Sequence, residues 1–257
     1  MSAAGRVMLV TGASRGIGAA IARRAARSGW RVGVNYVASE DAARSVVETV
    51  RAAGSEAVAL PADVSDPAAT AGMFVEVEHA LGPVRALVCN AGVDRESTIA
   101  DATDEDIRRI LAINTLGPIW CAREAVRRMS TARGGSGGVI VNVSSIAALY
   151  GGLPGDVVYA ASKGALDAFT QGLAKEVAAE GIRVCAVRPG LIRTEMWETG
   201  MGQDAVVELG TSAVPMRRIG ESDEVATAVC WLCSDEASYV TGAFMNVSGG
   251  RELFVRS

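Results

Sequence analysis

The sequence predicts an α/β fold in which a doubly wound parallel sheet of about seven strands is flanked by helices. Two observations lead to this prediction. Short β-branched runs alternate with longer alanine-rich stretches, which is the pattern of successive βαβ units. Runs such as residues 139–141 are apolar without polar alternation, as expected of strands that are buried on both faces. Together they indicate one parallel sheet between two layers of helices.

The expected elements follow one another in a regular order. Strands are expected at residues 6–11, 31–36, 56–60, 85–90, 138–143, 183–188 and 243–247. Helices are expected at residues 16–28, 40–53, 67–80, 103–129, 159–180 and 222–233. Because no repeat or linker interrupts them, residues 1–257 are expected to form a single domain. Residues 195–215 break the rhythm, and we expect a substrate lid there, with a plain surface excursion as the alternative.

Composition and charge exclude several classes of protein. The formal net charge of −4 and the absence of a basic stripe argue against a nucleic-acid partner. No apolar run reaches the roughly 18 to 20 residues that span a bilayer, so no membrane association is expected. Five scattered cysteines without a preceding signal segment favour a cytoplasmic setting. Cys230 and Cys233 form a C-x-x-C far from the only histidine, His79, so we expect two small buried residues and no metal site.

A glycine-rich turn follows the first expected strand. Residues 11–18 have the sequence TGASRGIG, and an alanine-rich helix begins there. Such glycines let the backbone approach a pyrophosphate, which a helix N-terminus favours through its free N–H groups and its dipole. The spacing differs from the G-x-G-x-x-G fingerprint, and an ordinary strand-to-helix turn is the alternative. We expect a Rossmann-type dinucleotide site formed by Gly12, Ser14, Arg15, Gly16, Ile17 and Gly18.

The end of the second expected strand indicates which dinucleotide binds. Its last residues, Val34-Asn35-Tyr36, lack the carboxylate that would hold the 2′-hydroxyl of NAD. Arg15 in the glycine turn is placed to face a 2′-phosphate instead. We therefore expect NADP(H) rather than NAD(H), with Asn35 among the cofactor contacts. A solvated Arg15 on an exposed loop is the alternative.

Tyr159 and Lys163 form a candidate acid–base pair on one face of an expected helix. A free phenol has a pKa near 10, and an ammonium about 4 Å away would lower it by roughly three units. Only two of the 25 basic residues are lysines, so a chance Y-x-x-x-K is expected about 0.03 times. Ser145 follows the fifth expected strand, where ligands gather in parallel sheets, and is expected to orient a carbonyl beside Tyr159. Ser144 is the competing candidate.

Further residues complete a family pattern. The glycine turn, Asn90-Ala91-Gly92, Asn114, Ser145, Tyr159 and Lys163 occur in this order. The chain thereby resembles the classical short-chain dehydrogenase/reductase family over nearly its whole length. Within that family it looks most like the 3-oxoacyl-carrier-protein reductase and glucose dehydrogenase branch.

The resemblance implies roles for residues outside the acid–base pair. Lys163 would also bind the cofactor ribose, and Asn114 would help to hold a water that links Lys163 to solvent. The remaining cofactor contacts that the resemblance implies are Asp63 and Val64 near adenine, Asn90, Ala91 and Gly92 in the supporting turn, and Pro189, Gly190, Ile192 and Thr194 near the nicotinamide carboxamide. The family resemblance also implies a homotetramer.

Three features depart from the family pattern. Cys89 stands where a second asparagine is usual. The spacing from Ser145 to Tyr159 is one residue longer than the commonest one, so we expect a small loop insertion near residues 151–156. Arg193 stands where relatives carry a small or acidic residue, and the sequence does not explain it.

The sequence thus predicts an NADP(H)-dependent oxidoreductase that acts on CH–OH groups of a small-molecule substrate. Ser145 would bind the carbonyl oxygen, Tyr159 would donate the proton and Lys163 would tune the phenol. Non-catalytic sensing of redox state through bound NADP(H) is the alternative, although such a sensor would not need all three residues. A further group of basic residues is expected to be either a rim for an acidic carrier protein or the solvated ends of two helices: Arg127, Arg128, Arg133 and Lys175.

Overall fold

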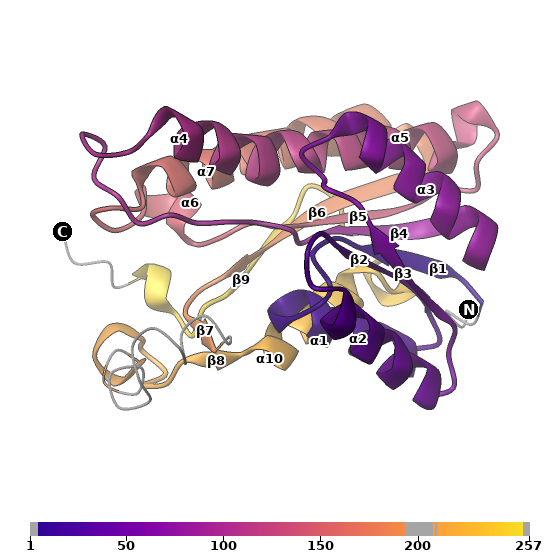
Figure 1. Cartoon of the computed structure of the whole chain (residues 1–257), viewed down its shortest axis with the longest axis horizontal. Helices are drawn as coiled ribbons and strands as arrows, with labels where there is room; N and C mark the ends of the chain where they lie inside the picture. The colour runs from indigo at the N-terminus through magenta and orange to yellow at the C-terminus, as the bar shows by residue number, and fades with distance from the viewer. Residues whose placement is uncertain (1–4, 194–207, 209, 254–257) are drawn as a thin grey trace.

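The fold is built on a parallel sheet of seven strands. The computed structural model describes residues 5–193, 208 and 210–253. The strands are β1 (Val7–Val10), β2 (Arg31–Tyr36), β3 (Ala57–Pro61), β4 (Val84–Cys89), β5 (Gly138–Val143), β6 (Ile182–Pro189) and β9 (Phe244–Val247). They lie in the order β3-β2-β1-β4-β5-β6-β9, and each neighbouring pair is parallel (Figure 1). This order confirms the predicted doubly wound sheet.

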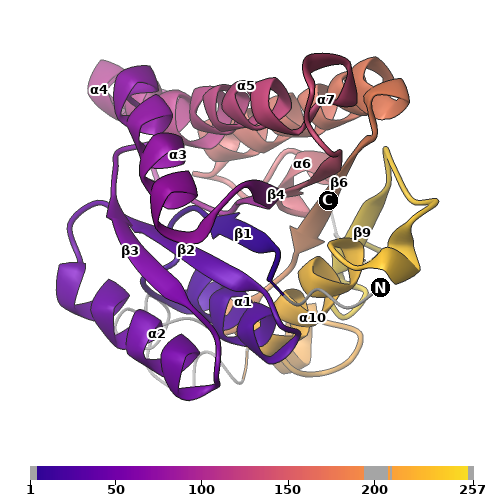
Figure 2. The same cartoon turned by 90° about the vertical axis from the view of Figure 1, so that its right-hand side faces the viewer.

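Helices cover both faces of the sheet. They are α1 (Gly16–Arg27), α2 (Glu40–Ala52), α3 (Pro67–Leu81), α4 (Asp104–Leu111), α5 (Gly117–Met129), α6 (Ala147–Tyr150), α7 (Val157–Val177) and α10 (Ser222–Leu232). α1, α2 and α10 lie on one face, and α3, α5 and α7 lie on the other (Figure 1, Figure 2). A second, short parallel pair is formed by β7 (Ile192–Arg193) and β8 (Gly220–Glu221).

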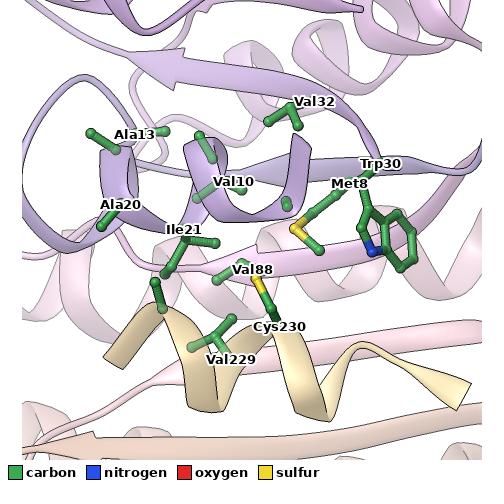
Figure 3. Packing of buried hydrophobic residues seen from close by; sticks show 14 of the residues in the cluster. Met8, Val10, Ala13, Ala20, Ile21, Trp30, Val32, Val88, Val229 and Cys230 are labelled. Carbon is green, nitrogen blue, oxygen red and sulfur yellow. The ribbon is translucent and has the colours of Figure 1, made fainter. Parts of the chain in front are cut away.

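Alternating side chains of each strand supply two hydrophobic clusters. In β1, Met8 and Val10 pack toward α1 and α10, whereas Val7 and Leu9 pack on the opposite face. Figure 3 shows the first cluster, with Ile21 of α1 close to Val229 of α10 beneath the sheet. A strand that buries both of its faces has no place for polar alternation, which is why these runs are continuously apolar.

The topology brings the carboxyl ends of β1 and β4 side by side. The chain passes from β1 outward to β2 and β3, and then returns to place β4 against the other edge of β1. Loops that leave such a pair turn in opposite directions, so a crevice opens between them. The glycine turn after β1 and the Asn90-Ala91-Gly92 turn after β4 therefore meet at one point.

The expected continuous helix at residues 103–129 differs from the structure in its middle. α4 is followed by a π-helical segment, Ala112–Leu116, and then by α5. Pro118 has no backbone N–H, so it cannot donate the usual bond to the carbonyl of Asn114 four residues earlier. A single π turn accommodates this loss, and such turns often mark functional sites. The predicted helix is thus continuous in the structure from Asp104 to Met129, and only the π turn within it was not predicted.

The C-x-x-C pair belongs to the core. Cys230 lies on α10 and Cys233 directly after it, and both are buried free thiols (Figure 3). Among the described residues, no group of three or more histidine, cysteine, aspartate or glutamate side chains is arranged to hold a metal ion. Within the same part of the chain, none of the helices has the length and apolar character needed to cross a membrane.

Candidate active site

The glycine turn is shaped by positions that leave no room for a side chain. Gly12 and Gly16 adopt φ angles of +60° and +55°, in the left-handed region that favours glycine. A Cβ atom on Gly18 would lie 2.3 Å from the carbonyl oxygen of Gly12 and 2.6 Å from Nδ2 of Asn90. The turn leads directly into α1, which has no side-chain cap and no acidic residue in its first turn. Its first N–H groups are thus oriented to bind an anion.

Asn35 fixes the glycine turn from below. Its Oδ1 accepts a hydrogen bond of 3.1 Å from the backbone N–H of Gly12, and its Nδ2 donates to the carbonyls of Leu60 (3.1 Å) and Ala62 (2.9 Å). Asn35 is only 1% exposed, so its side chain supports the turn from inside the protein. Arg15, by contrast, is exposed and has no ion pair among the described residues. Of these two expected cofactor contacts, only Arg15 presents its side chain to solvent.

The turn after β4 is tied to the glycine turn by a residue that sequence reasoning missed. The hydroxyl of Thr11 accepts hydrogen bonds from the backbone N–H groups of Asn90 (2.9 Å) and Ala91 (3.0 Å). The Nδ2 of Asn90 in turn donates to the carbonyls of Thr11 and Gly12, each at 3.0 Å. These bonds span about 80 residues of sequence, so no local pattern announces them. They hold two of the expected cofactor-binding turns in a fixed relation.

The two candidate serines at the end of β5 have different surroundings. Ser144 is buried, and its hydroxyl donates toward the carbonyl of Lys163 at 3.4 Å. Ser145 is half-buried, and its Oγ accepts from the N–H of Ala147 at 3.1 Å. A hydrogen bond with Ser145 also favours the phenolate form of Tyr159. Ser145 is therefore the serine that adjoins Tyr159.

Lys163 is buried beside Tyr159 on α7. Its Nζ donates a 2.9 Å hydrogen bond to the carbonyl of Val143 at the end of β5, and it lies 5.7 Å from the centre of the Tyr159 ring. Gly92 closes the other side, because a Cβ atom there would lie 3.4 Å from the same Nζ. The structure thus brings together the serine, the tyrosine, the lysine and the turn after β4.

The electrostatics of the pair differ from the expectation. Burial raises the pKa of Tyr159 to about 12, and the carboxylates of Asp94 and Asp156 act in the same direction. Burial also lowers the pKa of Lys163 to about 8, so its ammonium is less firmly charged than an exposed one. The predicted fall of the phenol pKa assumed a fully charged lysine in contact with the hydroxyl, whereas Nζ bonds to Val143 and faces the ring.

Asn114 lies in the π-helical segment and is fully buried. Its Oδ1 accepts from the N–H of Val93 at 2.8 Å, and its Nδ2 donates to the carbonyl of Val93 at 2.8 Å and to Oγ of Ser162 at 3.1 Å. A Cβ atom on Gly92 would lie 3.4 Å from Oδ1, so the residue borders Lys163 as expected. The side chain therefore ties the turn after β4 to α7.

Acidic residues that the sequence analysis did not single out lie near the tyrosine. The loop after β4 runs along the loop before α7, where the N–H of Ser97 donates to the carbonyl of Gly155 at 3.0 Å. Partial burial and the neighbouring Asp156 raise the pKa of Asp94. Glycines at 151, 152 and 155 have positive φ in the loop before α7, where an extra residue was expected. Asp94 and Asp156 thus lie on the two loops that border Tyr159.

The other expected cofactor contacts line the same edge of the sheet. Asp63 uses Oδ1 to accept from the N–H (2.8 Å) and hydroxyl (2.7 Å) of Ser65, and the buried Val64 packs against Gly117. The backbone N–H of Gly190 donates to Val247 (2.9 Å), and the carbonyl of Pro189 accepts from Ile146 (3.1 Å). Ile192 is buried within the α1 and α10 cluster. Thr194 and most of the expected lid at residues 195–215 lie outside the described residues.

Ion pairs within the chain account for Arg193 and for two arginines of the expected basic rim. Arg193 donates to Glu221 at 3.1 Å across the β7–β8 pair, which accounts for this departure from the family pattern. Arg127 and Arg128 each pair with the buried Glu124, at 2.8 and 2.6 Å, and Arg128 also pairs with Glu78 at 3.0 Å. Two members of the expected basic rim are thus paired with carboxylates of the chain itself.

Comparison with known proteins gives consistent matches. A family model described as enoyl-(acyl carrier protein) reductase matches residues 12–252. The chain is 49% identical over 247 residues to an uncharacterized oxidoreductase of Escherichia coli strain K12, which covers 95% of this chain and 99% of that protein. It is 36% identical over 242 residues to a 3-oxoacyl-[acyl-carrier-protein] reductase of Staphylococcus aureus, covering 94% and 96%. A solved short chain dehydrogenase from Burkholderia cenocepacia in complex with NADP has a TM-score of 0.90 at 34% identity, covering 98% and 99%.

Proposed function

The chain belongs to the short-chain dehydrogenase/reductase family of oxidoreductases, and from this we propose that it is an NADP(H)-dependent enzyme in which Ser145, Tyr159 and Lys163 interconvert a carbonyl and an alcohol. The observation that carries the proposal is the meeting of these three side chains with the turn after β4, which hydrogen bonds tie to the glycine turn. A redox sensor without turnover would have no use for a serine and a buried lysine beside one phenol.

The residues at this edge fit a dinucleotide. The glycine turn and the uncapped start of α1 present N–H groups to a pyrophosphate. Cβ atoms on Gly12 or Gly18 would press on Ala91 or on the carbonyl of Gly12, so only glycine allows this close-packed turn. We place the 2′-phosphate of NADP(H) against the exposed Arg15, because no carboxylate ends β2 to favour NAD(H). The complex of the Burkholderia cenocepacia relative with NADP supports this assignment.

Each side chain has a separate task in the proposed reaction. The bound nicotinamide supplies or accepts the hydride. Ser145 donates a hydrogen bond that orients the substrate oxygen, and Tyr159 donates its proton to that oxygen during reduction. Lys163 holds positive charge under the phenol and binds the cofactor ribose, as the family implies. Asn114 ties the turn after β4 to α7 and so keeps this turn beside Lys163.

The pKa values favour one direction of the reaction near neutral pH. Because burial raises the pKa of Tyr159 to about 12, the phenol is protonated and ready to donate. The reverse reaction needs the phenolate and therefore gains as the pH rises. We infer that carbonyl reduction is the direction this site performs best at neutral pH.

The charges around the site favour an uncharged substrate. Asp94 and Asp156 both act on Tyr159, so an anionic group near the carbonyl would be repelled. Arg127 and Arg128 are occupied by Glu124, which leaves Arg133 and Lys175 as a sparse basic rim for an acidic carrier protein. A small neutral ketone or aldehyde fits these observations better than a carrier-bound substrate.

We further propose that the enzyme is a cytoplasmic homotetramer. The family resemblance supports the assembly, and the five buried free cysteines are compatible with a reducing compartment. The mass of the native particle by light scattering tests the tetramer directly.

The experiment that tests the proposed function is NADPH oxidation against acyl thioesters, diketones, sugars and steroids. On an accepted substrate, Tyr159→Phe should lower turnover by about 10² to 10⁴-fold while NADPH binding is retained. Tyr239→Phe, which changes a fully exposed tyrosine, is the matched control and should leave turnover intact. Full turnover in Tyr159→Phe would refute the mechanism. NADPH binding without turnover of any carbonyl would instead favour the sensor.

A further inference from the structure

A buried ion pair lies directly behind the active-site lysine. Asp167 is on α7, one helical turn after Lys163 and two turns after Tyr159, so the three side chains share a helix face. The Oδ2 atom of Asp167 accepts from both Nε (2.8 Å) and Nη2 (2.7 Å) of Arg188 on β6. α7 packs on β6 along this contact (Figure 1). The side chains are 11% and 14% exposed, respectively.

The strand register places this pair beside the partner of Lys163. Val143, whose carbonyl accepts from Lys163, is paired with Val187 across β5 and β6. Arg188 is the next residue of β6, and its guanidinium lies 4.0 Å from the centre of the Phe244 ring on β9. Arg188 is therefore held by the carboxylate of Asp167 and by the ring of Phe244. It directly follows the residue that pairs with Val143.

A contribution to the stability of the fold does not explain why Asp167 and Arg188 are buried as an ion pair. Removing two charges from water costs several kcal/mol per ion, which the attraction between them often does not repay. Moreover, Oδ1 of Asp167 is buried and has no hydrogen-bond partner among the described residues. Leaving a buried carboxylate oxygen without a donor costs free energy, which again does not fit a purely stabilising role.

Lys163 is the neighbour that gains from this charge. Its burial disfavours the ammonium, and Asp167 is the strongest of the groups that oppose this effect. The other charged or titratable groups that act on it are Cys89 at the end of β4 and Asp94 in the following loop. The phenol of Tyr159 also faces it.

We propose that Asp167 is a positioning residue that keeps the ammonium of Lys163 charged, and that Arg188 holds Asp167 in place and ionised for this purpose. The inference rests on the proposed function for its role in the reaction. The charge on Lys163 itself can be measured without turnover, so the proposed role of Asp167 and the proposed function of the enzyme can fail separately.

The scarcity of lysine makes the measurement direct. Protein labelled with carbon-13 at lysine Cε gives signals from Lys163 and Lys175 alone, and the exposed Lys175 serves as an internal reference. In the wild type, Lys163 should titrate near pH 8. Asp167→Asn should move this midpoint downward by about one pH unit or more, because it removes the opposing charge. The exposed Glu176 on the same helix provides the control, and Glu176→Gln should leave the midpoint unchanged.

Two further variants protect the test against misfolding. Asp167→Glu retains the charge and should keep the midpoint within a few tenths of a unit of the wild type. The double variant Asp167→Asn with Arg188→Gln removes both charges, which buried pairs often tolerate, and it should still show a downward shift, smaller than that of the single variant because the repulsive charge of Arg188 is also lost. An unchanged Lys163 midpoint in Asp167→Asn and in the double variant would overturn the proposal.

The role in the reaction has its own readout. Reduction that needs the Lys163 ammonium is present below the pKa of Lys163 and is lost as the pH rises through it. In Asp167→Asn the alkaline limb of the kcat profile should therefore move to lower pH by the same amount as the midpoint. A shifted midpoint with an unshifted kcat profile would refute the positioning role while leaving the assignment of charge intact.

Discussion

Burial acts on Tyr159 and Lys163 in opposite directions, and both effects favour the uncharged form. The pKa of the phenol is raised to about 12, and that of the ammonium is lowered to about 8. A neutral tyrosine is the correct form for donating a proton, whereas a neutral lysine would lose its electrostatic role. A negative group near Lys163 therefore matters more to the site than a positive group near Tyr159, because it keeps the lysine charged. Asp167 is that group.

Arg15 is the residue whose change should alter the preference for the cofactor. It is exposed in the glycine turn, and β2 ends without a carboxylate. Charge-assisted hydrogen bonds to phosphate contribute about 1.5 to 3 kcal/mol, so Arg15→Ala should weaken NADPH about 10 to 100-fold and leave NADH nearly unchanged. Fluorescence titration with each cofactor measures both affinities. Arg27→Ala, at the exposed end of α1, is the control. An unchanged ratio of the two affinities would show that Arg15 does not bind the 2′-phosphate.

At the level of single residues, the sequence predicted which side chains meet but not all of their tasks. Tyr159 and Lys163 could be found because helical spacing is a local signal, whereas Ser145 was preferred to Ser144 largely through the family resemblance. Asn35 was expected to contact the cofactor, yet its side-chain amide hydrogen-bonds to the backbone of Gly12, Leu60 and Ala62. Those partners lie 23 to 27 residues away, and pairing over such distances leaves no trace in a local pattern.

The strand–turn–helix unit formed by β1, the glycine turn and α1 is the element that defines the cofactor site. Its conformation depends on the absence of side chains at Gly12 and Gly18, on the Asn35 amide beneath it and on the Thr11 hydroxyl beside it. The sequence predicted this unit because glycine spacing is a local property. The π segment before α5 was not predicted, and the hydrogen bonds that its Asn114 makes with Val93 join residues 21 positions apart, which leave no local pattern.

Gly18→Ala tests whether close packing of this element is required. The new Cβ would lie 2.3 Å from the carbonyl of Gly12, so the turn must shift, and overpacking of this kind costs about 1 to 3 kcal/mol. We expect a lower melting temperature and a weakened affinity for NADPH, measured by thermal unfolding and fluorescence titration. Gly72→Ala on α3 is the control, because nothing lies within 4 Å of its Cβ. The control should gain about 0.5 to 1 kcal/mol. Unchanged NADPH binding in Gly18→Ala would contradict the assigned position of the pyrophosphate.

At the scale of the molecule, the site is assembled from the carboxyl ends of β1, β4, β5 and β6. The doubly wound parallel sheet could be predicted, because alternating strands and helices allow few topologies. The contact between α7 and β6 that joins Asp167 to Arg188 could not, since it depends on the rotation of a helix over the sheet. Asp167 does stand four residues after Lys163, and this spacing was a usable signal that the sequence analysis passed over.

The two hydrophobic clusters share one sheet, and this predicts how the molecule unfolds. Loss of either helical layer exposes apolar side chains on a strand whose other face packs the second cluster, so the layers should unfold together. We expect a single thermal transition, consistent with one domain. NADPH at about 100 times its Kd stabilises the folded state by about 2.7 kcal/mol, which should raise the melting temperature by about 5 to 10 °C. NADH at the same concentration should raise it less. Calorimetry that resolves two transitions, only one of them shifted by NADPH, would show that the helical layers unfold independently and that the cofactor binds to one part alone.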